Sequence, residues 1–172
     1  MSMKNIYLII FLIPVFVFSN DKNYWITDVN IIAQLNSDGS MNIKENRTFK
    51  FKGSYKYIYQ KFKKTKGYDY LDFKISEGEN FYFLSDNQNS GNYSLKESKD
   101  HIEIKVYQKS KNESRTFSIE YIITGIIEKN IDAALMYYKF IGDQWNKSQS
   151  NINIQLYPPS ELKNNDIQAW LH

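Results

Sequence analysis

The sequence predicts an all-β domain, an antiparallel β-sandwich of immunoglobulin-like type with at most one short helix. Apolar and polar residues alternate with a period of two along most of the chain, which is typical of strands buried on one face. Spacers rich in Gly, Asn, Ser and Lys separate these runs, and such residues favour surface turns. The chain has 172 residues and no long stretch of helical periodicity, so we expect a single β domain.

The first strand pair carries the most specific signal. Alternation after Trp25 is followed by Asn36-Ser37-Asp38-Gly39 and resumes as Met41, Ile43 and Glu45. Because Asp-Gly supplies the positive backbone dihedral of a tight turn, these runs predict a hairpin. The residues of one parity in its first strand are Trp25, Thr27, Val29, Ile31 and Ala33.

Further alternating runs follow at short intervals, as a sandwich requires. They are Arg47 to Lys52, Tyr55 to Tyr59, Tyr70 to Ile75, Phe81 to Leu84, His101 to Tyr107, Thr116 to Ile123 and Asn151 to Tyr157. The segments between them that we interpret as surface turns are Ser76 to Asn80, Asp86 to Asn92 and Gln108 to Ser114. Asp132 to Phe140 fits either a helical face or a strand and stays unassigned.

The boundaries of the domain follow from its two ends. Lys4 precedes a short apolar run, Ile6 to Phe18, that contains Pro14 and is shorter than the ~20 residues of a membrane-spanning helix. We therefore expect a signal peptide over residues 1–19, cut near Ser19/Asn20, and an exported chain; an uncleaved N-terminal anchor or a buried strand stays open as the alternative. Residues 20–172 form one domain, with the sandwich over residues 24–159 and a polar tail over 160–172.

Composition excludes several kinds of chemistry. The chain has no cysteine and two histidines, His101 and His172, so disulfides, thiolate zinc sites, iron–sulfur sites and cysteine nucleophiles are excluded. No nucleophile triad, Gly-rich phosphate loop or Walker-like sequence is present. We expect no catalytic residue, no cofactor and no metal. The large aromatic residues that we expect in the core are Trp25, Phe49, Phe51, Tyr121, Phe140 and Trp145.

Basic residues gather in one segment. Residues 44–66 contain nine Lys or Arg and one acid, Glu45, in a chain of formal net charge +3. Alternation of Lys50 and Lys52 with aromatic residues indicates a solvated strand face. A sharper hypothesis is that a loop presents four ammonium groups to anionic lipid headgroups or an acidic cell-surface polymer rather than to nucleic acid. These residues are Lys61, Lys63, Lys64 and Lys66.

Several short motifs resemble, in their order and spacing, the predicted bacterial membrane proteins called domain of unknown function 2207. They are Tyr24-Trp25-Ile26-Thr27-Asp28, Asp38-Gly39-Ser40, Phe49-Lys50-Phe51-Lys52-Gly53, Tyr121 before Ile122-Ile123-Thr124-Gly125, the run from Tyr137 to Trp145, Leu156-Tyr157-Pro158 and Ala169-Trp170-Leu171-His172. The chain departs from the family at Tyr59-Gln60-Lys61-Phe62, where an arginine followed by Ile-Pro is frequent. The resemblance implies an extracytoplasmic domain that precedes transmembrane helices, so that the chain would be a truncated member, and it implies no activity or ligand.

Two classes of function fit these expectations. The first is a non-catalytic extracytoplasmic module that binds a protein or a surface polymer through exposed loops. The second is an envelope or carbohydrate-active enzyme with a pair of carboxylates about 5 to 10 Å apart, which a sequence does not display. We expect the first class, with the partner and the oligomeric state left open.

Overall fold

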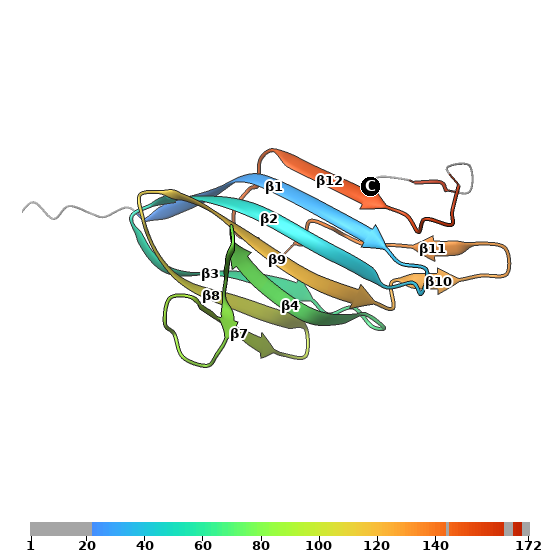
Figure 1. Ribbon diagram of the computed structural model, residues 1–172, viewed down its shortest axis with the longest axis horizontal. Coiled ribbons are helices and arrows are strands. Elements are labelled where there is room, and N and C mark those ends of the chain that lie inside the picture. The colour runs from blue at the N-terminus through green and yellow to red at the C-terminus, as the bar shows by residue number, and fades with distance from the viewer. Residues whose placement is uncertain (1–21, 144, 164–166, 170–172) are drawn as a thin grey trace, which may run out of the picture.

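The computed structural model describes residues 22–143, 145–163 and 167–169, and over this range it consists of strands, turns and irregular segments without a helix (Figure 1). The prediction of an all-β domain is confirmed. Within the described ranges there is accordingly no helix long and apolar enough to cross a membrane. The predicted signal peptide, residues 1–19, lies outside the described residues.

The larger sheet has six strands and includes both the first and the last strand of the chain. Its order is β12 (Ile152–Tyr157), β1 (Asn23–Leu35), β2 (Met41–Lys52), β9 (Ser114–Thr124), β4 (Asp69–Glu77) and β5 (Asn80–Phe81). The pair β1–β12 is parallel and the other pairs are antiparallel. β12 therefore forms one edge of this sheet, next to the first strand of the domain.

The smaller sheet has four strands and packs against the face of the larger one (Figure 1). Its order is β3 (Ser54–Lys63), β8 (His101–Lys111), β7 (Asn92–Glu97) and β6 (Phe83–Leu84), and a separate hairpin is formed by β10 (Ile127–Lys129) and β11 (Ala134–Met136). Buried residues of both sheets, such as Ile31, Phe117 and Ile104, form one core cluster. The long strands β1, β2, β9 and β4 thus face β3, β8 and β7, the arrangement of a two-sheet sandwich.

Two bends close one end of the sandwich. β2 turns into β3 at Gly53, and β8 turns into β9 at Asn112 and Glu113, so each ribbon passes from one sheet to the other. Gly53 N donates to Asn112 Oδ1 over 2.7 Å, and Phe51 N donates to the Glu113 carbonyl over 2.8 Å. Gly53 has φ +85°, which a residue with a side chain rarely adopts. We call this bonded pair of bends the corner.

A segment between β11 and β12 closes one side of the sandwich. This strap comprises residues 137–143 and 145–151. It is bonded to the larger sheet, since Ser150 N donates to the Ile26 carbonyl over 3.1 Å. It also reaches the smaller sheet, since Asn146 Nδ2 donates to the Tyr59 hydroxyl over 3.3 Å. The unassigned stretch from Asp132 to Phe140 is therefore β11 followed by the first part of the strap.

The predicted hairpin is confirmed, with Gly39 at φ +87° in its turn. The prediction that Trp25, in its first strand, belongs to the core was wrong. Trp25 is 43% exposed, whereas Phe49, Phe51 and Tyr121 are buried. A bulge at Thr27 shifts the register between Ile26 and Asp28, so the inward parity before the bulge is that of Ile26. Phe140 and Trp145 are partly buried and pack against the core.

Two predictions about connecting segments need correction. The stretch from Gln108 to Ser114 is not a surface turn along its length, because β8 continues to Lys111 and buries Gln108 and Ser110. β7 begins at Asn92 and was not predicted as a strand. The first error arises because the polar residues Gln108 and Ser110 face inward and interrupt the apolar alternation.

Candidate functional site

A buried ion pair lies between the two sheets. Glu45 and Arg47 both belong to β2, and each is 3% exposed. Arg47 Nη2 lies 2.6 Å from Glu45 Oε2 and Arg47 Nε lies 3.1 Å from it. Gln60, which comes from β3 in the opposite sheet, donates through Nε2 to the same carboxylate oxygen over 2.9 Å. The pair thus links the two sheets inside the core.

Two tyrosine hydroxyls extend this network. Tyr121 on β9 donates to Glu45 Oε1 over 2.5 Å, and its oxygen lies 3.1 Å from the hydroxyl of Tyr138 in the strap. Burial raises the pKa of Tyr121 well above its ordinary value of 10.0, and the nearby Glu45 carboxylate raises it further. Burial likewise raises the pKa of Tyr138. Both hydroxyls are therefore protonated donors at neutral pH.

Arg47 connects the network to the strap a second time. Its Nη1 donates to Gln149 Oε1, and its guanidinium lies 4.7 Å from the centre of the Trp145 ring. The Trp145 ring also contacts the ring of Phe49, with centroids 6.3 Å apart. A buried guanidinium against an aromatic face is stabilised by the ring quadrupole. The Glu45–Arg47 pair therefore holds the strap as well as the two sheets.

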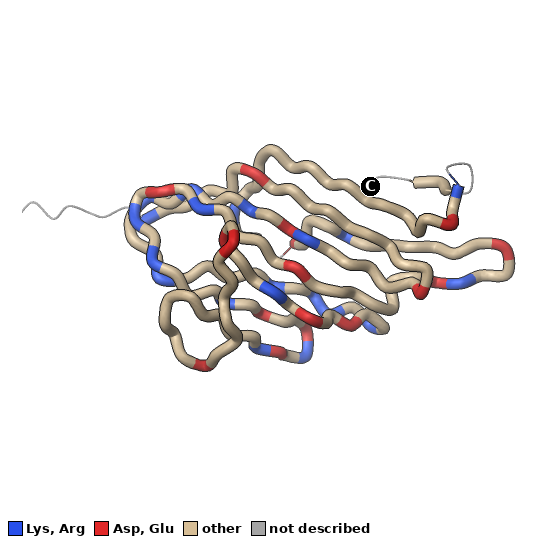
Figure 2. The backbone as a smooth tube through the Cα atoms, viewed as in Figure 1, with Lys and Arg blue, Asp and Glu red and all other residues tan. Residues whose placement is uncertain are grey.

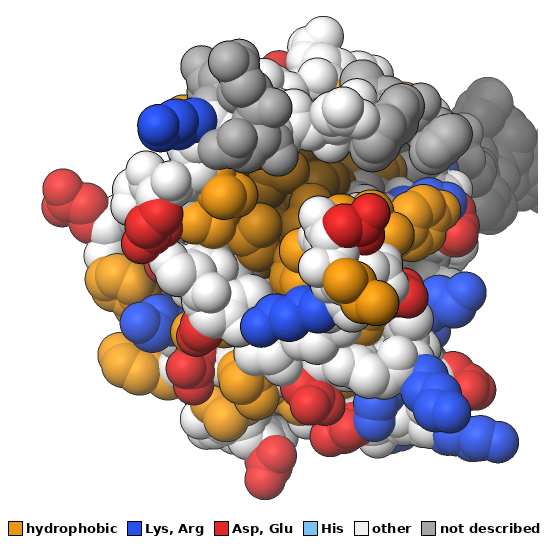
Figure 3. Space-filling model, turned by 90° about the vertical axis from the view of Figure 1, so that its right-hand side faces the viewer, with side chains coloured by type: hydrophobic (Ala, Val, Ile, Leu, Met, Phe, Trp, Pro, Cys, Tyr) orange, Lys and Arg blue, Asp and Glu red, His pale blue; other side chains and the backbone are white. Residues whose placement is uncertain are grey.

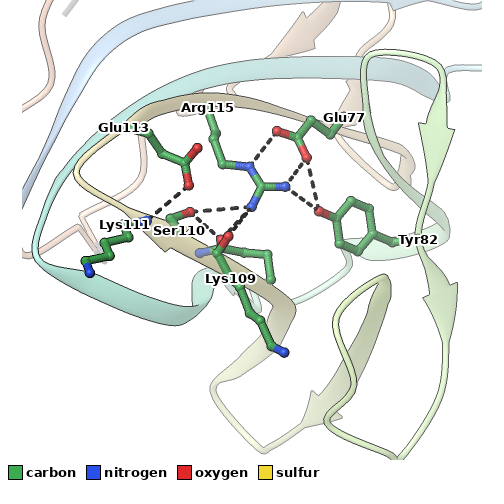
Figure 4. Close-up of polar contacts among 8 residues, drawn as sticks. Glu77, Tyr82, Lys109, Ser110, Lys111, Glu113 and Arg115 are labelled. Carbon is green, nitrogen blue, oxygen red and sulfur yellow. Dashed lines mark hydrogen bonds and ion pairs between the residues drawn. The ribbon is translucent and has the colours of Figure 1, made fainter.

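A second charged cluster lies near the corner, around Arg115 on β9 (Figure 4). Its Nε donates to Glu77 Oε1 over 2.6 Å and its Nη2 donates to Glu77 Oε2, a two-point contact that fits the planar guanidinium. Nη1 donates to Gln108 Oε1 in the other sheet over 2.8 Å. The hydrogen bonds to Glu77 raise the pKa of Arg115, and burial next to Glu77 raises the pKa of Tyr82 to about 12.

The space beside the Glu45–Arg47 pair is too small for a substrate. The cavity there measures about 10 Å³ and is lined by the ion pair and by Ile58, Gln60 and Trp145, among others. This volume accommodates about one water molecule. Over the described part of the chain, no group of three or more His, Cys, Asp or Glu side chains is placed to hold a metal ion.

The edge strand β12 exposes apolar side chains that point toward the interior. Ile152, Ile154 and Leu156 pair in register with Val29, Ile31 and Ala33 of β1, so the two sets share the inward face. The β1 residues are at most 1% exposed, whereas Ile152, Ile154 and Leu156 are 47%, 39% and 42% exposed. β12 lies at the margin of the sandwich (Figure 1), and among the described residues the only strand paired with it is β1. This edge is an apolar surface backed by a row of backbone groups.

The strand β12 itself carries no charged residue. The sequence has no Lys, Arg, Asp or Glu from Ser148 to Ser160, and Figure 2 shows the strand without blue or red. Its six residues pair with β1 without a register shift or an internal proline. Edge strands that must stay single usually carry lysines, prolines or bulges, because a regular edge is a template for another strand. The edge of β12 has the features of a strand that accepts a partner.

A second apolar surface lies at the end opposite the corner. Figure 3 looks onto this end and shows a hollow lined by apolar side chains. Partly buried hydrophobic residues at this end include Leu35, at the end of β1, and Ile127 and Met136 of the β10–β11 hairpin. This hollow presents side chains only, whereas the β12 edge also presents backbone donors and acceptors. We therefore take the β12 edge as the candidate functional site.

The four predicted contact lysines do not share a loop. Lys61 and Lys63 belong to β3, and Lys64 and Lys66 follow in the turn. Lys61 lies 3.6 Å from Glu103, and Lys64 forms an ion pair with Glu97. The prediction of a loop was therefore wrong for Lys61 and Lys63, because β3 continues to Lys63 and Phe62 is buried between them. Binding of these lysines to an anionic surface stays a prediction.

The structure thus defines a class: an all-β, two-sheet domain whose interior charges join its layers and whose edge strand β12 pairs on one side only within the described residues. The family model described as "Predicted membrane protein (DUF2207) N-terminal domain" matches residues 25–172. The chain belongs to this family, which confirms the resemblance in its sequence. No curated protein matches the chain.

Sequence reasoning missed the buried charged groups and the exposed edge. A signal for Glu45 and Arg47 was present, because they continue the inward parity of Met41 and Ile43 toward Phe49. For β12, alternation indicated a strand but did not show that its apolar face lacks a covering layer. That information depends on which strands lie opposite each other, and therefore on the topology.

Proposed function

We propose that this domain is a non-catalytic extracytoplasmic interaction module of a membrane-associated protein, and that it binds a protein partner along the outer edge of β12. The observation that carries the proposal is the uncharged, regular edge of β12 with the half-exposed apolar residues Ile152, Ile154 and Leu156 beside it. Edge strands of this kind bind by strand addition, in which backbone hydrogen bonds provide affinity and side-chain contacts provide specificity.

The interior supports a non-catalytic role. Glu45 accepts hydrogen bonds on both carboxylate oxygens, from Arg47, Gln60 and Tyr121. Glu77 is engaged on both oxygens by Arg115. Both carboxylates therefore accept hydrogen bonds from residues of the domain itself. The acidic groups of the two clusters are thus used to join the sheets.

Two further facts support the extracytoplasmic placement in the proposal. The family is described as the N-terminal domain of a predicted membrane protein. The chain also begins with Lys4 and the apolar run from Ile6 to Phe18, which has the length of a signal-peptide core. A domain outside the cytoplasm and close to a membrane encounters the surfaces of neighbouring envelope proteins.

Site-specific photo-crosslinking in the cells that make the protein tests this proposal. A photoreactive residue at Ile154 is expected to capture a protein in a discrete covalent adduct. The same residue at Ile32, which is similarly exposed at 37% but lies in β1, next to the edge strand, is the matched control and is expected to give no such adduct. Equal labelling at both positions, or none at Ile154, would contradict an interaction at this edge.

A further inference from the structure

We propose that the partner of the β12 edge is a second copy of this chain, joined in an antiparallel pair of β12 strands centred on Ile154. The inference rests on the proposed function and names the partner of that same surface. Three properties of β12 support it: the direction of its free backbone groups, the face of its apolar side chains, and its flanking charges.

The first property concerns hydrogen bonding. Asn151 uses its carbonyl toward β1, where it accepts from Val29 N over 3.2 Å. Because successive residues of a strand direct their backbone groups to opposite sides, Asn153 and Gln155 also face β1, and the even-numbered residues face outward. Ile152, Ile154 and Leu156 therefore carry the free donors and acceptors. Over the described residues no strand pairs with this side of β12.

The second property is that the same three residues carry the apolar side chains on the inward face. In an antiparallel pair centred on Ile154, Ile154 lies opposite its own copy and Ile152 lies opposite Leu156 of the second copy. All of these are positions with outward backbone groups, so each pair exchanges both N–H···O=C bonds. The apolar residues then meet on one face, and Asn153 meets Gln155 of the second copy on the other. A centre at Asn153 would place Leu156 opposite Ser150 of the second copy, and a centre at Gln155 would place Ile152 opposite Pro158, so only the centre at Ile154 pairs all three apolar residues with one another.

The third property is electrostatic. The strand itself is uncharged, so two copies do not repel each other along it. The first charged residue before β12 is Lys147 and the first after it is Glu161, which Ser37 holds through hydrogen bonds to its carboxylate. Antiparallel pairing brings the basic flank of one copy to the acidic flank of the other. Parallel pairing would bring like charges together, so charge complementarity favours the antiparallel arrangement.

Disulfide formation between single cysteines tests the register, because the natural chain has no cysteine. Directly opposite residues of a hydrogen-bonded antiparallel pair have Cα atoms ~5.5 Å apart, which is within the range of a disulfide. Ile154→Cys is expected to form a covalent dimer on the order of 100-fold faster than Asn153→Cys or Gln155→Cys, because only residue 154 lies directly opposite its own copy in this register, whereas residues 153 and 155 lie opposite each other. A mixture of Asn153→Cys and Gln155→Cys chains is expected to form the mixed dimer. Equal rates for all three single variants would overturn the register.

Sedimentation of the purified chain tests the pairing itself. The natural chain and Gln155→Lys are expected to sediment as dimers, whereas Ile154→Lys, which places two like charges at the centre, is expected to sediment as a monomer. Ile154 is 39% exposed, so this variant should keep the circular dichroism spectrum and melting temperature of a folded chain. A natural chain that is monomeric at all accessible concentrations overturns the dimer. If photo-crosslinking at Ile154 then captures a different protein, the proposed function stands without the dimer; if it captures none, both fall.

Discussion

The hydroxyl of Tyr121 on β9 donates a 2.5 Å hydrogen bond to Glu45 Oε1 on β2, within a core otherwise formed largely by Ile, Val and Phe. Tyr121→Phe leaves that buried oxygen without this donor, and we expect it to lower the free energy of unfolding by about 1–3 kcal/mol. Urea denaturation measures the change. Tyr138→Phe is the matched control, because Tyr138 bonds to Tyr121 rather than to Glu45 and should cost less. Equal costs would show that the carboxylate contact is not the stabilising one.

Replacing the carboxylate itself is expected to have a larger effect. Glu45→Gln leaves the guanidinium of Arg47 buried without its counter-charge, and breaking such a pair typically costs about 3–5 kcal/mol. The exposed pair of Lys44 and Glu120, 2.7 Å apart, provides the comparison: Glu120→Gln should cost less than about 1 kcal/mol. Thermal unfolding of both variants distinguishes them, and similar losses in the two would contradict a structural role for Glu45.

Stability is expected to fall in alkaline solution. The pKa of Tyr82 is raised to about 12 and that of Tyr121 is raised well above 10.0. Below pH 10 both residues are protonated in the folded and the unfolded chain, so their contribution is fully present. Above pH 10 the unfolded chain loses these protons while the folded chain keeps them, so the free energy of unfolding decreases as pH rises toward 12.

Denaturation at a series of alkaline pH values measures this slope. Tyr82→Phe removes one of the groups and should reduce the slope by about one proton over the same window. Tyr157→Phe makes the same substitution at an exposed tyrosine of β12 and is the comparison for the change in slope that belongs to Tyr82. A free energy of unfolding that stays constant from pH 10 to 12 would contradict the prediction.

Gly125 is expected to tolerate no side chain. A Cβ at this position would lie 1.7 Å from the carbonyl oxygen of Gly67, and its φ is +74°. Gly125→Ala therefore combines a backbone clash with a strained dihedral, and should cost more than the ~1–2 kcal/mol of the dihedral alone. Gly78→Ala isolates the strain, because Gly78 has φ +57° and nothing within 4 Å of an added Cβ. If the two variants unfold at the same denaturant concentration, the close approach is not the cause.

Anionic-surface binding by the four lysines of β3 and the turn after it is tested with liposomes. Changing Lys61, Lys63, Lys64 and Lys66 to Gln is expected to weaken binding to anionic vesicles at low salt, by up to about 1 kcal/mol per charge. Lys61 and Lys64 already form ion pairs with Glu103 and Glu97. We therefore expect most of the lost binding to come from the changes at Lys63 and Lys66. The control removes the same number of charges at Lys50, Lys52, Lys109 and Lys111. Equal effects of both sets would show that net charge alone is responsible.

Local patterns predicted the elements whose environment is local. The turn at Asp38-Gly39 and the burial of Phe49 and Phe51 follow from residues close in the chain. Trp25 could not be placed this way, because one bulge residue, Thr27, reverses the parity of everything before it. The candidate site at β12 depends on its parallel pairing with β1 and on the smaller sheet opposite having fewer strands. Neither of these can be predicted from the sequence of residues 152–157 alone.

That parallel pairing also determines when the domain can be completed. Asn30 on β1 and Asn153 on β12 are bonded side chain to side chain although 123 positions separate them. During synthesis, β1 can pair with β2 early. The edge of β1 that faces β12 stays unpaired until almost the whole domain has been made. Contacts of such long sequence separation require a large loop-closure entropy before they contribute, so folding in the slow range of milliseconds to seconds is the kinetic consequence. Until β12 arrives, Val29, Ile31 and Ala33 lie in an edge strand that neighbouring nascent chains could extend, which makes this interval the period of greatest aggregation risk.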